Sequence, residues 1–137
     1  MVIPEVEEAS AVRILLVDDD YDTARALGRW LEYNHYKVDL FTDPRMALSR
    51  FSANSYRLTV IDHKMHCLSG FELYERLIAI DPALKVCFVT AYNMSGLDEF
   101  KQKHKLTADC FVKKPVDSDI LLAAVRKLFE PPQGQND

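Results

Sequence analysis

The stretch Leu58-Thr-Val-Ile-Asp-His-Lys-Met-His-Cys-Leu-Ser-Gly70 decides the fold of this chain of 137 residues. Its first residues are apolar and partly β-branched, which predicts a short buried strand that ends on the carboxylate of Asp62. A polar loop follows, and an amphipathic helix is predicted to begin at Gly70. A carboxylate in this position lies where open parallel α/β sheets carry their chemistry. Taken alone, Asp62 is better explained as the cap of a turn.

Three further predicted strands end on reactive side chains, which argues against the interpretation of Asp62 as only a turn cap. The reactive groups follow their strands directly: Asp18, Asp19 and Asp20 after residues 13–17, Thr90 after residues 85–89, and Lys114 after residues 109–113. In a parallel sheet the carboxyl ends of all strands lie along one edge. We therefore expect these side chains to face one another.

Helical spacing of apolar residues separates the strands. The predicted helices cover residues 22–33, 44–51, 70–80, 95–105 and 118–128. A fifth strand, over residues 36–40, alternates apolar and polar residues, which indicates lower burial and a place at an edge of the sheet. Five strands that alternate with five helices predict one doubly wound parallel α/β sheet. The helix over 95–105 has a thin apolar face, so we expect it to be weakly held.

Composition narrows the classes of function. A net charge of −4, from 17 Lys and Arg against 21 Asp and Glu, gives no footprint for nucleic acid or for an anionic membrane. The sequence contains no apolar run long enough to span a bilayer and no signal peptide. Its three cysteines are expected to be free thiols of a cytoplasmic protein. We expect residues 1–11 to form a flexible leader, residues 12–130 one domain, and residues 131–137 a polar tail or the start of a linker.

The aspartates predict a site for a cation. Asp18 and Asp19, facing Asp62 from a neighbouring strand, would repel one another unless a cation neutralised them. Oxygen ligands at this density suit Mg²⁺, which keeps several waters and binds through a few carboxylates. The hydroxyl of Thr90 and the ammonium of Lys114, placed opposite a metal-bound carboxylate, are groups that the oxygens of a phosphoryl group require.

At this point the chain resembles the receiver domain of two-component response regulators, the CheY-like family. The matching segments are Ile14–Asp20, Asp62 with Met65 and Gly70 downstream, Val89–Ala91 and Phe111–Pro115. The resemblance spans about residues 12–130 and implies a flavodoxin-like (βα)5 fold with strand order 2-1-3-4-5. It implies a phosphoacceptor that takes a phosphoryl group from a sensor histidine kinase or a phosphotransfer protein. Such a domain is a signalling protein rather than an enzyme, although it takes part in its own Mg²⁺-dependent phosphorylation and dephosphorylation.

The resemblance also implies the acceptor and the metal ligands. By this resemblance, Asp62 is expected to be the phosphorylated residue. Asp19 and Asp62 are expected to bind Mg²⁺ directly, together with the backbone carbonyl of Lys64, and Asp18 to bind the ion through water.

Further roles implied by the resemblance concern the phosphoryl group and the switch. Lys114 pairs with the acyl phosphate, and its peptide bond to Pro115 is expected to be cis. Thr90 and Ala91 contact the phosphoryl oxygens. Thr90 and Phe111 move together, and the face made by the fourth helix, the fifth strand and the fifth helix serves a partner or a homodimer.

The sequence departs from the family pattern at two informative positions. His66 stands where proline is usual, and Phe111 stands where tyrosine is commoner, so the switch lacks a hydroxyl. Neither change removes a reactive group, and we expect an active receiver. His63 and His66 are interpreted as solvated loop residues rather than zinc ligands, because zinc sites generally need three or four converging ligands.

Two rival classes make different predictions. A haloacid-dehalogenase-like phosphatase would use Asp18 as nucleophile and Asp20 as acid, with Thr90 and Lys114 in support. That family needs a further acidic strand end after the lysine, and only a helix is predicted there. A structural flavodoxin-like interaction module would show no dependence on Mg²⁺. The identity of the modified aspartate, Asp62 or Asp18, separates the receiver from the phosphatase.

Overall fold

The chain folds into a parallel sheet covered by helices on both faces. The computed structural model describes residues 12–90 and 111–129. Its elements, in chain order, are β1 (Arg13–Val17), α2 (Tyr21–Tyr33), β2 (Lys37–Phe41), α3 (Pro44–Arg50), β3 (Leu58–Asp62), α4 (Gly70–Ile80), β4 (Lys85–Thr90), β5 (Phe111–Lys113) and α6 (Ser118–Phe129). The predicted helix over 95–105, the first residues of the strand predicted over 109–113, Ala91, and the two terminal segments lie outside the described residues.

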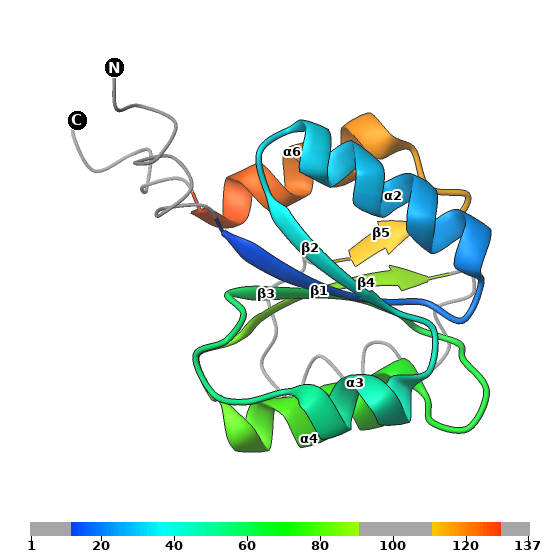
Figure 1. The fold of residues 1–137 in the computed structure, drawn as a ribbon. Helices are drawn as coiled ribbons and strands as arrows, with labels where there is room; N and C mark the ends of the chain where they lie inside the picture. Colours follow the sequence, from blue (N-terminus) through cyan, green and yellow to red (C-terminus); the bar gives the residue numbers. More distant parts are fainter. Residues whose placement is uncertain (1–11, 91–110, 130–137) are drawn as a thin grey trace.

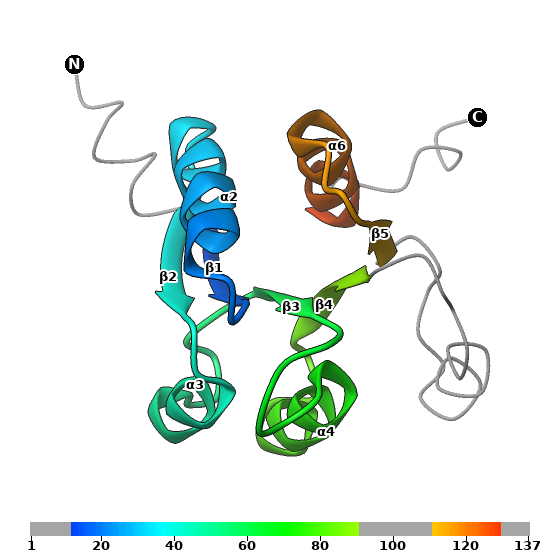
Figure 2. The ribbon, with the colours of Figure 1, turned by 90° about the vertical axis from the view of Figure 1, so that its right-hand side faces the viewer.

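The sheet has the predicted topology. All its strands run parallel, in the order β2-β1-β3-β4-β5. The helices α2 and α6 cover one face, and α3 and α4 cover the other (Figures 1 and 2). Each face has its own apolar core, and every residue of β3 is buried between the two. Among the described residues, no helix is long and apolar enough to cross a membrane.

Each described helix begins at a side chain that accepts hydrogen bonds from the first turn. Asp20 serves α2, Asp43 serves α3, and Asp117 serves α6. Ser69 and Glu72 form a reciprocal capping box at the start of α4. Such caps satisfy backbone donors that have no partner within the helix.

Strand β2 lies at an edge of the sheet, as its alternating pattern predicts. It pairs with β1 alone among the described strands, and most of its residues are half-buried. Asp39 in this strand accepts hydrogen bonds from the Arg13 guanidinium at 2.8 Å and from the Tyr56 hydroxyl at 2.6 Å. A charged residue in an edge strand discourages pairing with another chain.

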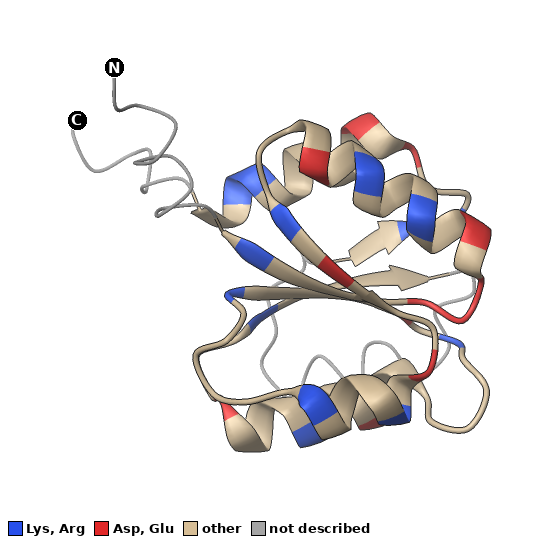
Figure 3. Ribbon diagram, viewed as in Figure 1, with Lys and Arg blue, Asp and Glu red and all other residues tan. Residues whose placement is uncertain are grey.

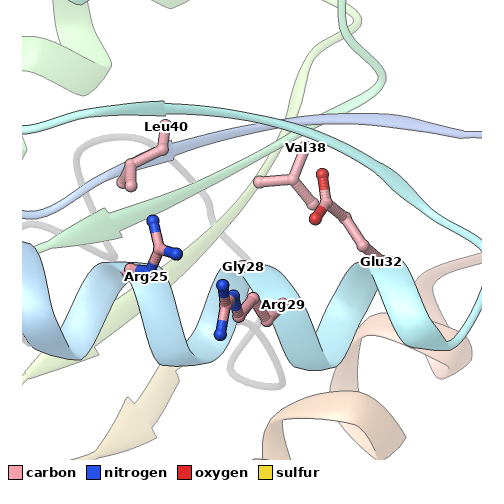
Figure 4. A pocket seen from close by; sticks show the side chains of 6 residues that line it. All are labelled: Arg25, Gly28, Arg29, Glu32, Val38 and Leu40. Carbon is pink, nitrogen blue, oxygen red and sulfur yellow. The ribbon is translucent and has the colours of Figure 1, made fainter.

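Between α2 and β2 lies a groove of about 280 Å³ (Figure 4). It is lined by Arg25, Gly28, Arg29, Glu32, Val38 and Leu40. None of these residues belongs to the predicted site. Acidic residues gather instead at the carboxyl end of β1 (Figure 3).

Candidate functional site

The carboxyl ends of β1 and β3 bring three aspartates together. Asp18, Asp19 and Asp62 each offer a carboxylate oxygen, and these oxygens lie within 4.8 Å of one another. Asp18 is 2% exposed and Asp62 is 3% exposed, whereas Asp19 is half-buried. The strands that carry these residues are neighbours in the sheet, which explains why residues far apart in the chain meet here.

The electrostatics of Asp18 favour a cation at this cluster. Burial, with a smaller contribution from the neighbouring charge of Asp62, raises the pKa of Asp18 from 3.8 to about 6. A hydrogen bond that the Asp20 amide donates to Asp18 Oδ1 at 2.9 Å opposes this rise. Ionised carboxylates in so buried a place are stabilised by a positive charge. A set of carboxylate oxygens is also the kind of ligand that Mg²⁺ takes, so the residues present fit this ion.

Lys114 reaches the cluster from the end of β5. Its Nζ lies 3.0 Å from Asp62 Oδ1, and its amide donates to the Thr90 carbonyl oxygen at 2.7 Å. The Lys114–Pro115 peptide bond is cis. Burial opposes the charge of the Lys114 ammonium, but the hydrogen bond to Asp62 and the attraction of the carboxylates outweigh burial and raise the pKa of Lys114.

Gly70 allows the first turn of α4 to sit against the end of β3. A Cβ atom at this position would lie 2.5 Å from the Asp62 carbonyl oxygen and 3.0 Å from His63 Cα. The Gly70 amide donates to the His63 carbonyl oxygen at 2.9 Å. The glycine is therefore required by a close approach of two backbone segments next to the aspartates.

Thr90 and His63 are in contact beside the cluster. The Thr90 hydroxyl oxygen lies 3.3 Å from His63 Nδ1, and the His63 ring lies 4.5 Å from the ring of Phe71. Burial, with the nearby charge of Lys64, lowers the pKa of His63. The prediction that His63 is a solvated loop residue is therefore wrong: it is half-buried, because its ring packs on α4.

His66 is exposed, as predicted, but it has a partner that the sequence did not indicate. Its Nδ1 lies 2.8 Å from Asp19 Oδ2, and its amide donates to the same oxygen at 3.1 Å. Within the described part of the chain, neither loop histidine joins the group of three aspartates that could hold a metal.

For three predicted site residues, the structure does not establish the predicted role. Phe111 is half-buried and stacks on Phe88, with 5.4 Å between the ring centroids. Lys64 is exposed, and the role of its carbonyl stays a prediction. Ala91 lies outside the described residues.

A second groove, of about 470 Å³, opens next to Lys114. It is lined by Asp20, Thr23, Ala26, Leu27, Lys114, Pro115 and Val116. Lys114 also contacts Asp62, so it belongs both to this groove and to the surroundings of the acidic cluster.

The chain is similar to known proteins of one family. The family model of the response regulator receiver domain matches residues 14–126. The response regulator MprA of Mycolicibacterium vanbaalenii is 34% identical over 123 residues, which are 86% of this chain and 50% of that protein. The transcriptional regulatory protein PcoR of Escherichia coli is 32% identical over 126 residues, 90% of this chain and 54% of that protein. The chain thus spans about half the length of these relatives.

A solved structure gives the same result for the fold. The CheY-like receiver domain protein of Methanospirillum hungatei superposes with a TM-score of 0.78 at 27% identity. The superposition covers 87% of this chain and 94% of that one.

Proposed function

The chain belongs to the response regulator receiver domain family, and from that premise we propose that Asp62 accepts the phosphoryl group. The position of Asp62 carries the proposal. Its carboxylate is buried at the end of β3, 3.0 Å from the Lys114 ammonium and beside the carboxylates of Asp18 and Asp19. Neither the family match nor the relatives support the rival phosphatase that would use Asp18 as its nucleophile.

The proposed transfer exchanges one bond to phosphorus for another. A carboxylate oxygen of Asp62 attacks the phosphorus of a phosphohistidine, and a P–O bond forms while the P–N bond breaks. The electron pair of the broken bond stays on the imidazole nitrogen. Lys114 already contacts Asp62 and offsets the charge on the phosphoryl oxygens. Hydrolysis of the acyl phosphate by water then returns the carboxylate and releases inorganic phosphate.

Mg²⁺ is part of this proposal, and members of the receiver family generally bind it. Asp19 and Asp62 would hold the ion directly with the Lys64 carbonyl, and Asp18 would hold it through water. When bound, the ion would offset part of the negative charge on the phosphoryl oxygens, as Lys114 does. The close carboxylates and the raised pKa of Asp18 support this assignment.

A mass measurement tests the acceptor. After incubation with Mg²⁺ and acetyl phosphate, the wild type should gain the mass of one phosphoryl group, and the Asp62→Asn variant should gain none. The amide cannot form an acyl phosphate, whereas Asp18→Asn leaves the proposed acceptor in place. A mass gain that persists in Asp62→Asn would overturn the assignment.

We further propose that Thr90 and Ala91 contact the phosphoryl oxygens and that Thr90 and Phe111 form the switch. Phe111 has no hydroxyl, so its inward position gains only packing, and this state should be populated without phosphate. Amide hydrogen exchange with and without beryllofluoride tests the switch. Changes within residues 95–113 support it, and changes confined to residues 43–51 contradict it.

The proposed partners follow from the same role. The phosphodonor is a sensor histidine kinase or a phosphotransfer protein, and the face formed by the helix over 95–105, β5 and α6 serves a partner or a homodimer. Residues 12–130 form the receiver, between the leader and the polar tail. Direct contact with nucleic acid is not part of this role. We place the chain in the cytoplasm, consistent with the free thiols of Cys67 and Cys87.

A further inference from the structure

The contact between His63 and Thr90 is built into the ends of β3 and β4. The Thr90 hydroxyl oxygen lies 3.3 Å from His63 Nδ1, and Thr90 is 3% exposed. Asp62 pairs with Val89 in the sheet, so the residues that follow them lie side by side. The His63 amide also donates to the Val89 carbonyl oxygen at 2.8 Å. The register of the sheet thus brings the ring and the hydroxyl together.

This contact lies on the face of the sheet opposite the Asp62 carboxylate. Side chains alternate between the two faces along a strand. Phe88 packs in the core beneath α3 and α4, so Thr90, two residues later, points to the same face. Ile61 packs in that core too, so Asp62 points to the other face, where it contacts Lys114. The Thr90 hydroxyl therefore has to turn away from its present partner to reach a phosphoryl group on Asp62.

The ring of His63 packs against the aromatic side chain of Phe71. It lies 4.5 Å from the ring of Phe71, which meets Phe88 edge to face at 5.1 Å. Phe88 in turn stacks on Phe111 at 5.4 Å. Because the Phe71 ring packs against the imidazole, we expect the imidazole to stay in place when the hydroxyl turns. The same row of rings includes the proposed aromatic switch residue.

We propose that His63 is a positioning residue that restrains Thr90 and competes with a phosphoryl group on Asp62 for its hydroxyl. The proposal rests on the proposed function, because it takes Asp62 as the acceptor. In either tautomer of His63, the hydroxyl leaves the ring when it turns toward Asp62. Phosphorylation therefore breaks this contact, and the contact favours the unphosphorylated arrangement. The usual net strength of a hydrogen bond corresponds to a factor of roughly three to ten in that preference.

The test measures the binding of beryllofluoride, with Mg²⁺ present, by fluorine NMR on the full chain. His63→Phe keeps a ring against Phe71 but lacks the nitrogen, and should bind beryllofluoride roughly three- to tenfold more tightly than the wild type. His63→Asn places a polar atom near the position of Nδ1 and should stay close to the wild type. In a Thr90→Val background, His63→Phe should change nothing, because the hydroxyl is already absent.

The outcomes separate this proposal from the proposed function. Unchanged or weaker binding by His63→Phe overturns the proposal, and so does tightening that persists beside Thr90→Val. His63→Leu also lacks the nitrogen and replaces His63→Phe if the latter does not fold. A wild type that unfolds cooperatively but binds no beryllofluoride overturns the proposed function, and this proposal with it.

Discussion

The variant Asp18→Asn should make the metal-free protein more stable. At pH 7.5, Asp18 is ionised in both the folded and the unfolded chain, but in the folded chain its charge is buried beside Asp62. A difference of one pKa unit corresponds to about 1.36 kcal/mol, so a pKa raised from 3.8 to about 6 means that the ionised group costs the folded state about 3 kcal/mol. The amide side chain removes the charge, and its oxygen can still accept the hydrogen bond from the Asp20 amide.

The sign of the pH dependence follows from proton linkage. Asp18 has a pKa of 3.8 in the unfolded chain and of about 6 in the folded chain. Between these two values the folded chain binds more protons than the unfolded chain, so the ionised Asp18 destabilises the fold less as the pH falls. The difference between Asp18→Asn and the wild type should be about 3 kcal/mol at pH 7.5, about half of that at pH 5, and close to zero near pH 3.

Urea unfolding in EDTA, followed by circular dichroism at pH 7.5 and pH 5, measures this difference. Asp18→Ala is the matched control, because it removes the charge and also leaves the Asp20 amide without its side-chain acceptor. It should gain less stability than the asparagine variant. Equal stability of the wild type and Asp18→Asn at pH 7.5, or a difference that grows toward pH 5, would refute the reasoning.

Further substitutions test the loop after β3 and the proposed metal ligands. Gly70→Ala should lower the free energy of unfolding by about 1–3 kcal/mol, because its Cβ would meet the Asp62 carbonyl oxygen at 2.5 Å; an unchanged urea midpoint contradicts this. Ser69→Ala should cost about 1 kcal/mol through the lost cap, with Ser69→Thr as the near-neutral control. Asp19→Asn should weaken Mg²⁺ binding in calorimetry more than Asp18→Asn does, and equal effects would remove Asp19 from the direct ligands.

Much of the fold was predictable because local signals and the global topology agree. Apolar runs that end on polar groups marked β1, β3 and β4, and alternation marked β2 as an edge strand. The N-caps Asp43 and Asp117 were readable as helix starts. The boundaries differ by a residue at some ends: α2 begins at Tyr21 and β2 ends at Phe41. Such differences are expected, because helix and strand ends are set by single hydrogen bonds.

The placement of the three aspartates and Lys114 was also predictable, since a parallel sheet aligns the carboxyl ends of its strands. The contacts of His63 and His66 were not. They depend on the path of the loop after β3, where Cys67 adopts a left-handed conformation with φ of 73°. A loop has no periodicity that reveals which way its side chains point, and a residue other than glycine in that conformation gives no composition signal.

The division of the core between two faces has a consequence for the order in which the protein forms during synthesis. Among the described residues, the core beneath α3 and α4 is built almost entirely from residues that precede position 90, with Phe111 as a later addition. The opposite core needs Leu121, Leu122 and Val125, which a ribosome adds after all the described strands. A growing chain therefore leaves part of this face, beyond the area that α2 covers, exposed until α6 emerges, and we expect the protease resistance of stalled nascent chains to rise after that point.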